Sequence, residues 1–281
     1  MPDQAKLEDP RGRFRQMREQ AISIGESGNA RHTVTILSQL LDESVAIFGE
    51  DHLETLTVRD ELVHWIGEAG QPIPAAEGAR VVFEARRKLQ GDEHPDTLYT
   101  LHTLVYWLGE LGELNEAVRL SRDLFARREK VLGKEHPDTL YARHRLACWI
   151  AEAEDAKEGI AMLRDLLPIR ERMLGAEHPH TLATRHELAR WTAHSGDIEA
   201  GLAMLRDLLP IRGKVQGPTH HRTLNTRHEL AALLAQADKR EEALTHLHEL
   251  QSIRSDILGA SHPHTLKTIE LHNQLSLDPP M

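Results

Sequence analysis

Apolar residues recur at intervals of three and four along most of the chain, and short polar breaks interrupt them. In the segment that starts at Thr181, one such stripe is followed by a break at Ser195-Gly196-Asp197 and then by a second stripe. The first stripe consists of Leu182, Arg185, Leu188, Ala189 and Thr192, and the second of Ile198, Leu202, Leu205, Leu208, Leu209 and Ile211. This spacing places each stripe on one face of a helix. The pattern therefore predicts two amphipathic helices joined by a tight turn.

The helix pair repeats at an interval of 42 residues. The hexapeptide EHPDTL occupies residues 93–98 and occurs again at 135–140, and four diverged copies keep the same register. Its histidine recurs at His52, His94, His136, His178, His220 and His262, and its threonine at Thr55, Thr97, Thr139, Thr181, Thr223 and Thr265. A fixed period of this length indicates a repeat protein, in which each unit packs mainly on its neighbours.

The hexapeptide is expected to start the first helix of each pair. Proline has no N–H to lose in a first turn, and the acid after it suits the positive end of the helix dipole. The histidine and the threonine are expected to bond the free backbone donors of that turn. Glycine in a left-handed conformation is expected to close each second helix, at positions 49, 91, 133, 175, 217 and 259. An arginine near each of these ends is expected to complement the dipole and the last carbonyls, at Arg86, Arg128, Arg170, Arg212 and Arg254.

These signals predict an all-α protein of six helix pairs and a capping helix. The pairs are expected to start near residues 13, 53, 95, 137, 179 and 221, and the capping helix to occupy 263–275. One solenoid would then span 13–275, with tails at 1–12 and 276–281. The tryptophans share one register and are expected to act as knobs between stacked helices, at Trp65, Trp107, Trp149 and Trp191.

Composition and charge narrow the class of partner. The formal charge of −10 argues against binding of a phosphate backbone, because such binding requires clustered Lys and Arg. No nucleic-acid partner is therefore expected. No apolar run approaches the roughly 18 residues that span a bilayer, and the first residues are polar rather than those of a signal peptide. The single cysteine, Cys148, excludes an internal disulfide and fits a reducing compartment. We therefore expect a cytoplasmic protein with no membrane contact.

Two longer stretches carry a resemblance to a known family. The segments LGKEHPDTLYARHRLACWIAEAE and LGAEHPHTLATRHELARWTAHSGDIEAGLAMLRDLLPIR resemble tetratricopeptide repeats of the 42-residue kind, found in kinesin light chain and in actinobacterial regulatory proteins. The resemblance covers residues 13–275 and implies a right-handed α-solenoid. It also implies a protein–protein interaction scaffold whose concave groove, lined by the first helices, holds a peptide or protein segment. Relatives often carry Asn beside the groove position, whereas this chain has Glu61, Thr103, Arg145, Glu187 and Glu229 there.

The groove-facing residues are expected opposite the buried stripe, because a helix turns about 100° per residue. The central position of the groove then reads Asp60, His102, His144, His186, His228 and Glu270. All three tyrosines of the chain fall on the same arc, and tyrosine and arginine dominate binding hot spots. The predicted peptide-binding residues are Tyr99, His102, Tyr106, Tyr141, His144, Cys148, His186, Arg190 and His228. Histidines that titrate near pH 6.5 are expected to strengthen binding of an acidic partner as the pH falls.

Alternative functions for the same groove are a peptide- or ligand-gated regulator, an enzyme and a metal-binding protein. Neighbouring histidines of the groove could converge on an ion, with Cys148 as a further ligand. Repeat duplication explains the histidines without a metal, so neither a metal nor another cofactor is expected. A Cys148–His144 nucleophile pair is possible at this spacing, but nothing supplies an oxyanion hole. The sequence therefore favours a non-catalytic scaffold.

Overall fold

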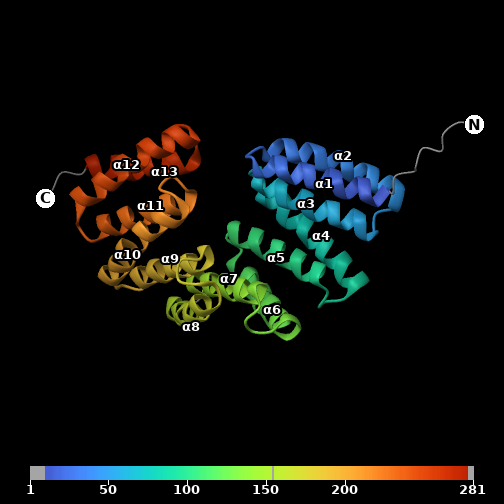
Figure 1. Cartoon of the computed structure of the whole chain (residues 1–281), viewed down its shortest axis with the longest axis horizontal. Helices are drawn as coiled ribbons and strands as arrows, with labels where there is room; N and C mark the ends of the chain where they lie inside the picture. The colour runs from blue at the N-terminus through green and yellow to red at the C-terminus, as the bar shows by residue number, and fades with distance from the viewer. Residues whose placement is uncertain (1–9, 154, 278–281) are drawn as a thin grey trace, which may run out of the picture. The chain divides into compact units, whose positions relative to one another are not determined.

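The computed structural model describes residues 10–153 and 155–277, and within these ranges it contains thirteen α-helices and no β-strand. The first helices of the pairs are α1 (Pro10–Glu26), α3 (Leu53–Glu68), α5 (Pro95–Glu110), α7 (Pro137–Ala153), α9 (Pro179–His194) and α11 (His221–Gln236). The second helices are α2 (Ala30–Phe48), α4 (Pro72–Gln90), α6 (Leu114–Leu132), α8 (Ala156–Leu174), α10 (Ile198–Gln216) and α12 (Arg240–Leu258). A last single helix is α13 (Pro263–Leu277). The predicted all-α repeat architecture is confirmed (Figure 1).

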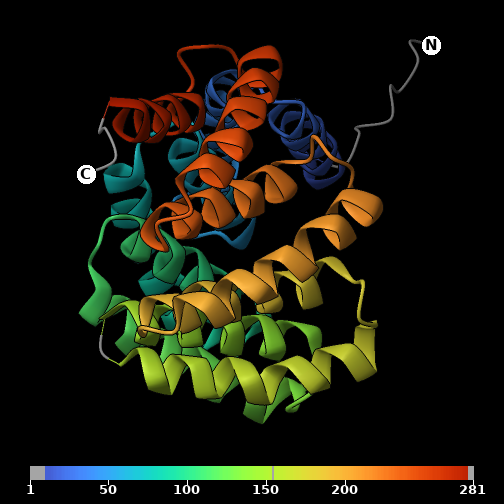
Figure 2. The ribbon, with the colours of Figure 1, turned by 90° about the vertical axis from the view of Figure 1, so that its left-hand side faces the viewer.

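The chain divides into two compact units, Met1–Ala142 and Arg143–Met281, with the boundary inside α7. Within each unit consecutive helices pack against each other, and first helices also contact the next first helix, as α3 contacts α5 and α9 contacts α11. Figure 2 shows α9 to α13 of the second unit running back and forth from yellow to red. A single solenoid over 13–275 stays a prediction, and the predicted tails lie mostly outside the described residues.

Each first helix that follows a hexapeptide begins at a histidine cap. The Nδ1 atom of the histidine accepts a hydrogen bond from the backbone N–H two residues later, at 3.2 Å in all six copies. An acceptor at this position satisfies one of the free donors of the first turn, as Ser or Asp does in other helices. The predicted role of the histidine is confirmed.

The threonine of the hexapeptide acts differently from the prediction. In four of the six copies its hydroxyl donates backwards to a carbonyl near the end of the preceding helix, as from Thr55 to Gly49 O at 2.8 Å and from Thr223 to Gly217 O at 2.9 Å. The prediction that it would bond backbone donors is wrong, because the hydroxyl is buried against the chain that enters the helix. The threonine therefore ties the end of one pair to the start of the next.

The glycines at the ends of the second helices have φ angles between 86° and 100°, as predicted, but ψ angles between 150° and 168°. This extended region with positive φ is accessible almost only to glycine. The chain therefore leaves each second helix straight into the loop before the next histidine cap.

The core of each unit lies between the apolar stripes of its helices. Trp65 packs against Gly25 of α1, and Trp107 packs against Gly67 of α3, so closely that a Cβ on either glycine would lie within 2.3 Å of the indole ring. In the second unit Trp191 joins the cluster of Ala147, Leu163 and neighbouring residues. The tryptophans are therefore knobs between stacked helices, as predicted.

Candidate peptide-binding face

Four of the predicted binding residues lie on α5 and on the first turns of α7, within the first unit. The rings of His102 and Tyr141 meet edge to face, with centroids 5.1 Å apart, so these two helices present one aromatic surface. Tyr106 packs edge to face on Trp107 with centroids 4.7 Å apart. Tyr99 is 43% exposed, whereas the other three side chains are half-buried. The structure brings these predicted residues together as an aromatic face, which we call the tyrosine face: Tyr99, His102, Tyr106 and Tyr141.

A buried polar cluster lies beside Tyr99. The carboxylate of Asp60 accepts from Thr100 Oγ1 at 2.8 Å and pairs with Arg86 Nε at 2.8 Å, and Arg86 Nη1 also pairs with Asp96 at 2.9 Å. Burial raises the pKa of Asp60 to about 7, although Arg86 and Thr100 act to lower it. Burial, and then the charges of Glu61 and Asp60, raise the pKa of Tyr99 to about 12. The Tyr99 phenol is therefore a neutral hydrogen-bond donor at physiological pH.

The arginines near the ends of the second helices form most of their side-chain bonds with atoms outside their own helices. In the second unit Arg212 Nη1 donates to Arg222 O at 2.7 Å and to Thr226 Oγ1 at 2.8 Å, in the first turns of the next first helix. Arg170 and Arg254 make the same pair of bonds one repeat earlier and one repeat later. The prediction that these arginines complement their own helix ends is wrong, because the guanidinium extends across the junction between repeats. We call them the junction arginines: Arg86, Arg128, Arg170, Arg212 and Arg254.

The histidines of the second unit lie beside these arginines rather than on an open surface. His144 is only 7% exposed, and His186 and His228 are half-buried. Burial, and then the charge of Arg212, lower the pKa of His186 to about 3. Burial and Arg254 lower the pKa of His228 to about 4, and burial and Arg170 lower that of His144 well below its ordinary value. The expected strengthening of binding by protonation near pH 6.5 is therefore wrong for these three residues.

The Cys148–His144 pair does not form an activated nucleophile. The sulfur lies 3.9 Å from His144 Nε2, but Cys148 is 7% exposed, and burial raises the pKa of its thiol well above the ordinary value. A thiol held neutral is a poor nucleophile and a poor metal ligand. Among the described residues no group of three or more His, Cys, Asp or Glu side chains could hold a metal ion. Both residues belong to the interior of the second unit.

Arg190 is already engaged within the second unit. It pairs with Glu187 at 3.6 Å and stacks over Trp191, with its guanidinium 4.8 Å from the ring centroid. Arg145 stacks in the same way over Trp149 at 4.4 Å. Among the nine predicted binding residues, Tyr99 of the tyrosine face is the one whose side chain is exposed.

The contacts that the junction arginines make with the next first helix were not predicted from the sequence. The sequence did contain a sign of these contacts, because positions 86, 128, 170, 212 and 254 are arginine in five successive repeats, and an arginine kept only for a dipole would be replaceable by lysine.

Among the described residues, no helix is long and apolar enough to cross a membrane.

The structure defines a class of protein built from stacked helical hairpins, with an aromatic face on its first helices. Models of the tetratricopeptide repeat match residues 97–138, 139–180 and 180–256, which is more than half of the chain. The chain belongs to the tetratricopeptide repeat family, and its repeats are of the kinesin-light-chain-like type.

Solved structures support the same assignment. Nearly identical repeats of a kinesin-light-chain-like protein from Podosopora anserina are 28% identical in sequence, with a TM-score of 0.65, over 74% of this chain and 98% of that one. BtubC (BKLC) from P. vanneervenii is 16% identical, with a TM-score of 0.57, over 93% of this chain and 95% of that one, and it shows the fold alone. No curated protein matches this chain by sequence.

Proposed function

We propose that the protein is a non-catalytic scaffold that binds a peptide or a segment of a partner protein on the tyrosine face. Repeats of this family generally mediate protein–protein interactions. The observation that carries the finer proposal is the gathering of all three tyrosines of the chain, with His102, on two neighbouring first helices. Core packing does not require tyrosine at these positions, because the same positions in other repeats hold residues as different as alanine, asparagine, cysteine, lysine and arginine.

The chemistry of this face indicates the kind of segment that it binds. Tyrosine offers a large apolar ring with a polar tip, so it can bury an apolar side chain and still bond a peptide carbonyl. Because Glu61 and Asp60 lie close enough to Tyr99 to raise its pKa, an acidic residue is disfavoured next to that ring. The ligand is therefore an extended segment with an apolar anchor over His102 and Tyr141. The unpaired, buried Cys148 supports a cytoplasmic location.

The test uses a partner captured from the native organism and identified by mass spectrometry, followed by an affinity measurement with the purified segment. Replacing Tyr99, Tyr106 and Tyr141 with alanine is expected to weaken binding at least tenfold, which corresponds to about 1.4 kcal/mol. A matched variant, with Val131, Val215 and Ile257 changed to alanine, removes exposed apolar side chains from second helices instead. Equal affinities of parent and tyrosine variant, within about twofold or 0.4 kcal/mol, would show that the partner binds elsewhere.

A further inference from the structure

Glu61 of α3 is a half-buried carboxylate that has no hydrogen bond or ion pair with any other described residue. Burial raises the pKa of Glu61, and the charges of Arg18 and His64 offset this rise only in part. A carboxylate that is partly removed from water without a partner is unfavourable. The structure therefore leaves a place for a positive charge beside Glu61.

The aromatic neighbour of Glu61 is Tyr99 of α5, which is the most exposed residue of the tyrosine face. After burial, the charge of Glu61 contributes most to raising the pKa of Tyr99 to about 12. The two helices that carry these residues, α3 and α5, contact each other. A carboxylate and an exposed ring therefore border one patch, which we call the Glu61 patch: Glu61 and Tyr99.

The second unit shows how the chain neutralises a carboxylate at this position. Glu187 of α9 corresponds to Glu61, three repeats further along the chain. Arg190 pairs with Glu187 at 3.6 Å and also stacks over Trp191, 4.8 Å from the ring centroid. Burial raises the pKa of Glu187, and Arg190 and Arg145 both act against this rise. In the second unit a guanidinium is thus held between the carboxylate and an aromatic ring.

The arginines that act on Glu187 have no counterpart in the repeats around Glu61. His64 stands at the position of Arg190, and Glu19 stands at the position of Arg145. The first unit therefore keeps the carboxylate and an aromatic ring but lacks the arginine that lies between them in the second unit.

A third carboxylate at the same position has a lysine nearby in the repeat register. Glu229 of α11 is followed in the next first helix by Lys267, at the position that Tyr99 holds relative to Glu61. Among the carboxylates at this position, Glu61 alone lacks an arginine or lysine at all of the positions compared. The cation that suits Glu61 must therefore come from another molecule.

We propose that the Glu61 patch binds a lysine or arginine side chain of the partner segment. This inference rests on the proposed peptide binding and adds a specificity to it. The cation pairs with the carboxylate of Glu61 and stacks on the ring of Tyr99. Adjacent first helices are about 8 to 10 Å apart, and an extended chain rises about 3.3 Å per residue. Because the apolar anchor lies over His102 and Tyr141, the basic residue is roughly three to five residues away from it.

The charge of the Glu61 patch disfavours other side chains. An acidic side chain would meet the like charge of Glu61, and an apolar one would remove more water from the carboxylate without neutralising it. The partner segment is therefore basic next to its anchor. This is the reverse of the acidic partner that the histidines of the groove led us to expect.

A library of random peptides displayed on phage, applied to the purified full chain, tests this specificity. Segments selected by the parent are expected to share an apolar anchor and a lysine or arginine roughly three to five residues from it. Glu61→Gln removes the charge with little change in size, and it is expected to select the anchor without the basic residue.

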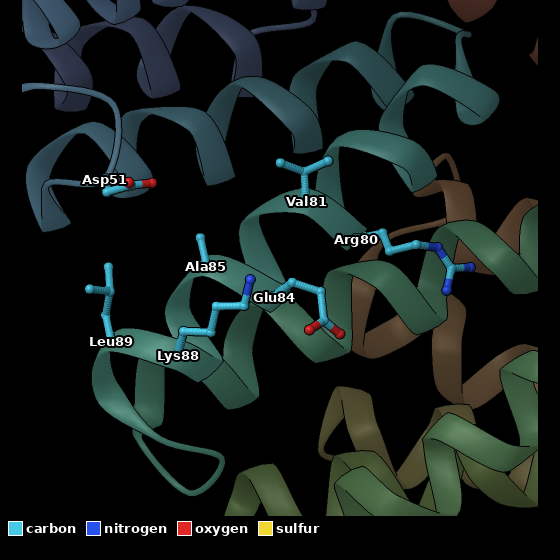
Figure 3. A pocket seen from close by; sticks show the side chains of 7 residues that line it. All are labelled: Asp51, Arg80, Val81, Glu84, Ala85, Lys88 and Leu89. Atoms are coloured by element: carbon cyan, nitrogen blue, oxygen red, sulfur yellow. The ribbon is translucent and has the colours of Figure 1, made fainter.

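Glu84→Gln is the matched control and is expected to select the same segments as the parent. Glu84 is also a half-buried carboxylate of the first unit, but it lies on the second helix α4 and pairs with Arg87 at 2.8 Å. It borders a hollow of about 550 Å³ beside Val81 and Leu89, away from the first helices that carry the tyrosine face (Figure 3).

One selected peptide then measures the contact itself. Replacing its basic residue with glutamine is expected to weaken binding to the parent about tenfold, but to weaken binding to Glu61→Gln by less than about twofold. Effects of equal size in the two proteins overturn the inference, and so does a selection of segments without a basic residue. In both cases the proposed function still stands if replacing the three tyrosines with alanine weakens binding. A parent that selects no segment overturns the inference and the proposed function together.

Discussion

At the residue scale, one position of the first helix holds either a carboxyl or an imidazole, and a buried junction arginine lies beside it. The carboxylate of Asp60 forms an ion pair with the guanidinium of Arg86, so the acid has a partner of opposite charge. His186 is near Arg212, and Thr226 Oγ1 lies 3.4 Å from its Nδ1. Protonation of an imidazole beside a buried cation is unfavourable, because it would place two positive charges next to each other. The same fold position therefore favours an uncharged ring in the second unit.

The low pKa of His186, about 3, makes the second unit sensitive to acid. The unfolded chain binds a proton near pH 6.5 while the folded ring does not, so the stability that this residue contributes is complete above pH 6.5. It is lost as the pH falls toward the folded pKa, by at most about 1.4 kcal/mol per pH unit. His186→Gln is expected to flatten the dependence of the unfolding free energy on pH between 6.5 and 4.5, measured in urea.

The same substitution at the exposed His248 is the matched control for the change from histidine to glutamine. Ring resonances of His186 that titrate near pH 6.5 in an NMR experiment would contradict the argument.

At the scale of the element, the first helices depend on an unusual cap. Histidine replaces the usual Ser, Thr, Asp or Asn, and the proline that follows in several copies holds the first turn in helical geometry. The cap of α9 is His178, which accepts from His180 N at 3.2 Å. Its Nδ1 atom therefore acts as the acceptor of the cap.

Removing this acceptor should destabilise the second unit. His178→Ala is expected to lower the unfolding free energy by about 1 kcal/mol, because one backbone donor of α9 loses its partner. His178→Asn should recover most of the loss, since its side-chain oxygen can accept the same bond. Thermal unfolding followed by circular dichroism compares the three proteins. An alanine variant as stable as the parent would show that the His178 cap does not stabilise α9.

The elements could be predicted from the sequence more completely than the face that they build. The caps at His94 and His178 and the closing glycines follow from local rules, and these rules were sufficient to place the helices. The partners of Thr223 and Arg212 could not be predicted, because the atoms that they bond lie in a neighbouring helix or repeat. The burial of His144 and Cys148 was missed for a related reason: helical periodicity gives the direction of a side chain, but not how far the next helix covers it.

At the scale of the molecule, each unit is held together by contacts between neighbouring repeats, so the last helix has a role beyond covering apolar surface. Arg254 is 2% exposed and donates to His264 O at 3.0 Å and to Thr268 Oγ1 at 2.7 Å, both in α13. Without α13 a buried guanidinium would lose these acceptors and keep only Asn225 among its hydrogen-bond partners, at 2.8 Å.

Removing residues 263–281 is therefore expected to destabilise the second unit by more than its lost apolar contacts account for. Arg254→Leu should lower the stability of the full chain, where it breaks bonds to α13, and have a smaller effect on the shortened chain, where those bonds are already lost. Urea unfolding of the four proteins gives the coupling between the two changes. Additive effects, with no coupling beyond about 0.5 kcal/mol, would mean that α13 acts only as an apolar cover.

The junction arginines give the array a direction. Each one reaches forward from its own repeat into the next, so the second to the sixth repeats each supply one donor at their end, and the first helix that follows supplies the acceptors. Adding or deleting a block of 42 residues leaves donors and acceptors in equal number, whatever the number of blocks. A chain that stopped at a block boundary, directly after a second helix, would leave its last junction arginine without these acceptors. Such an array can change its length during evolution only by whole blocks of 42 residues. After its last second helix it always requires one further first helix.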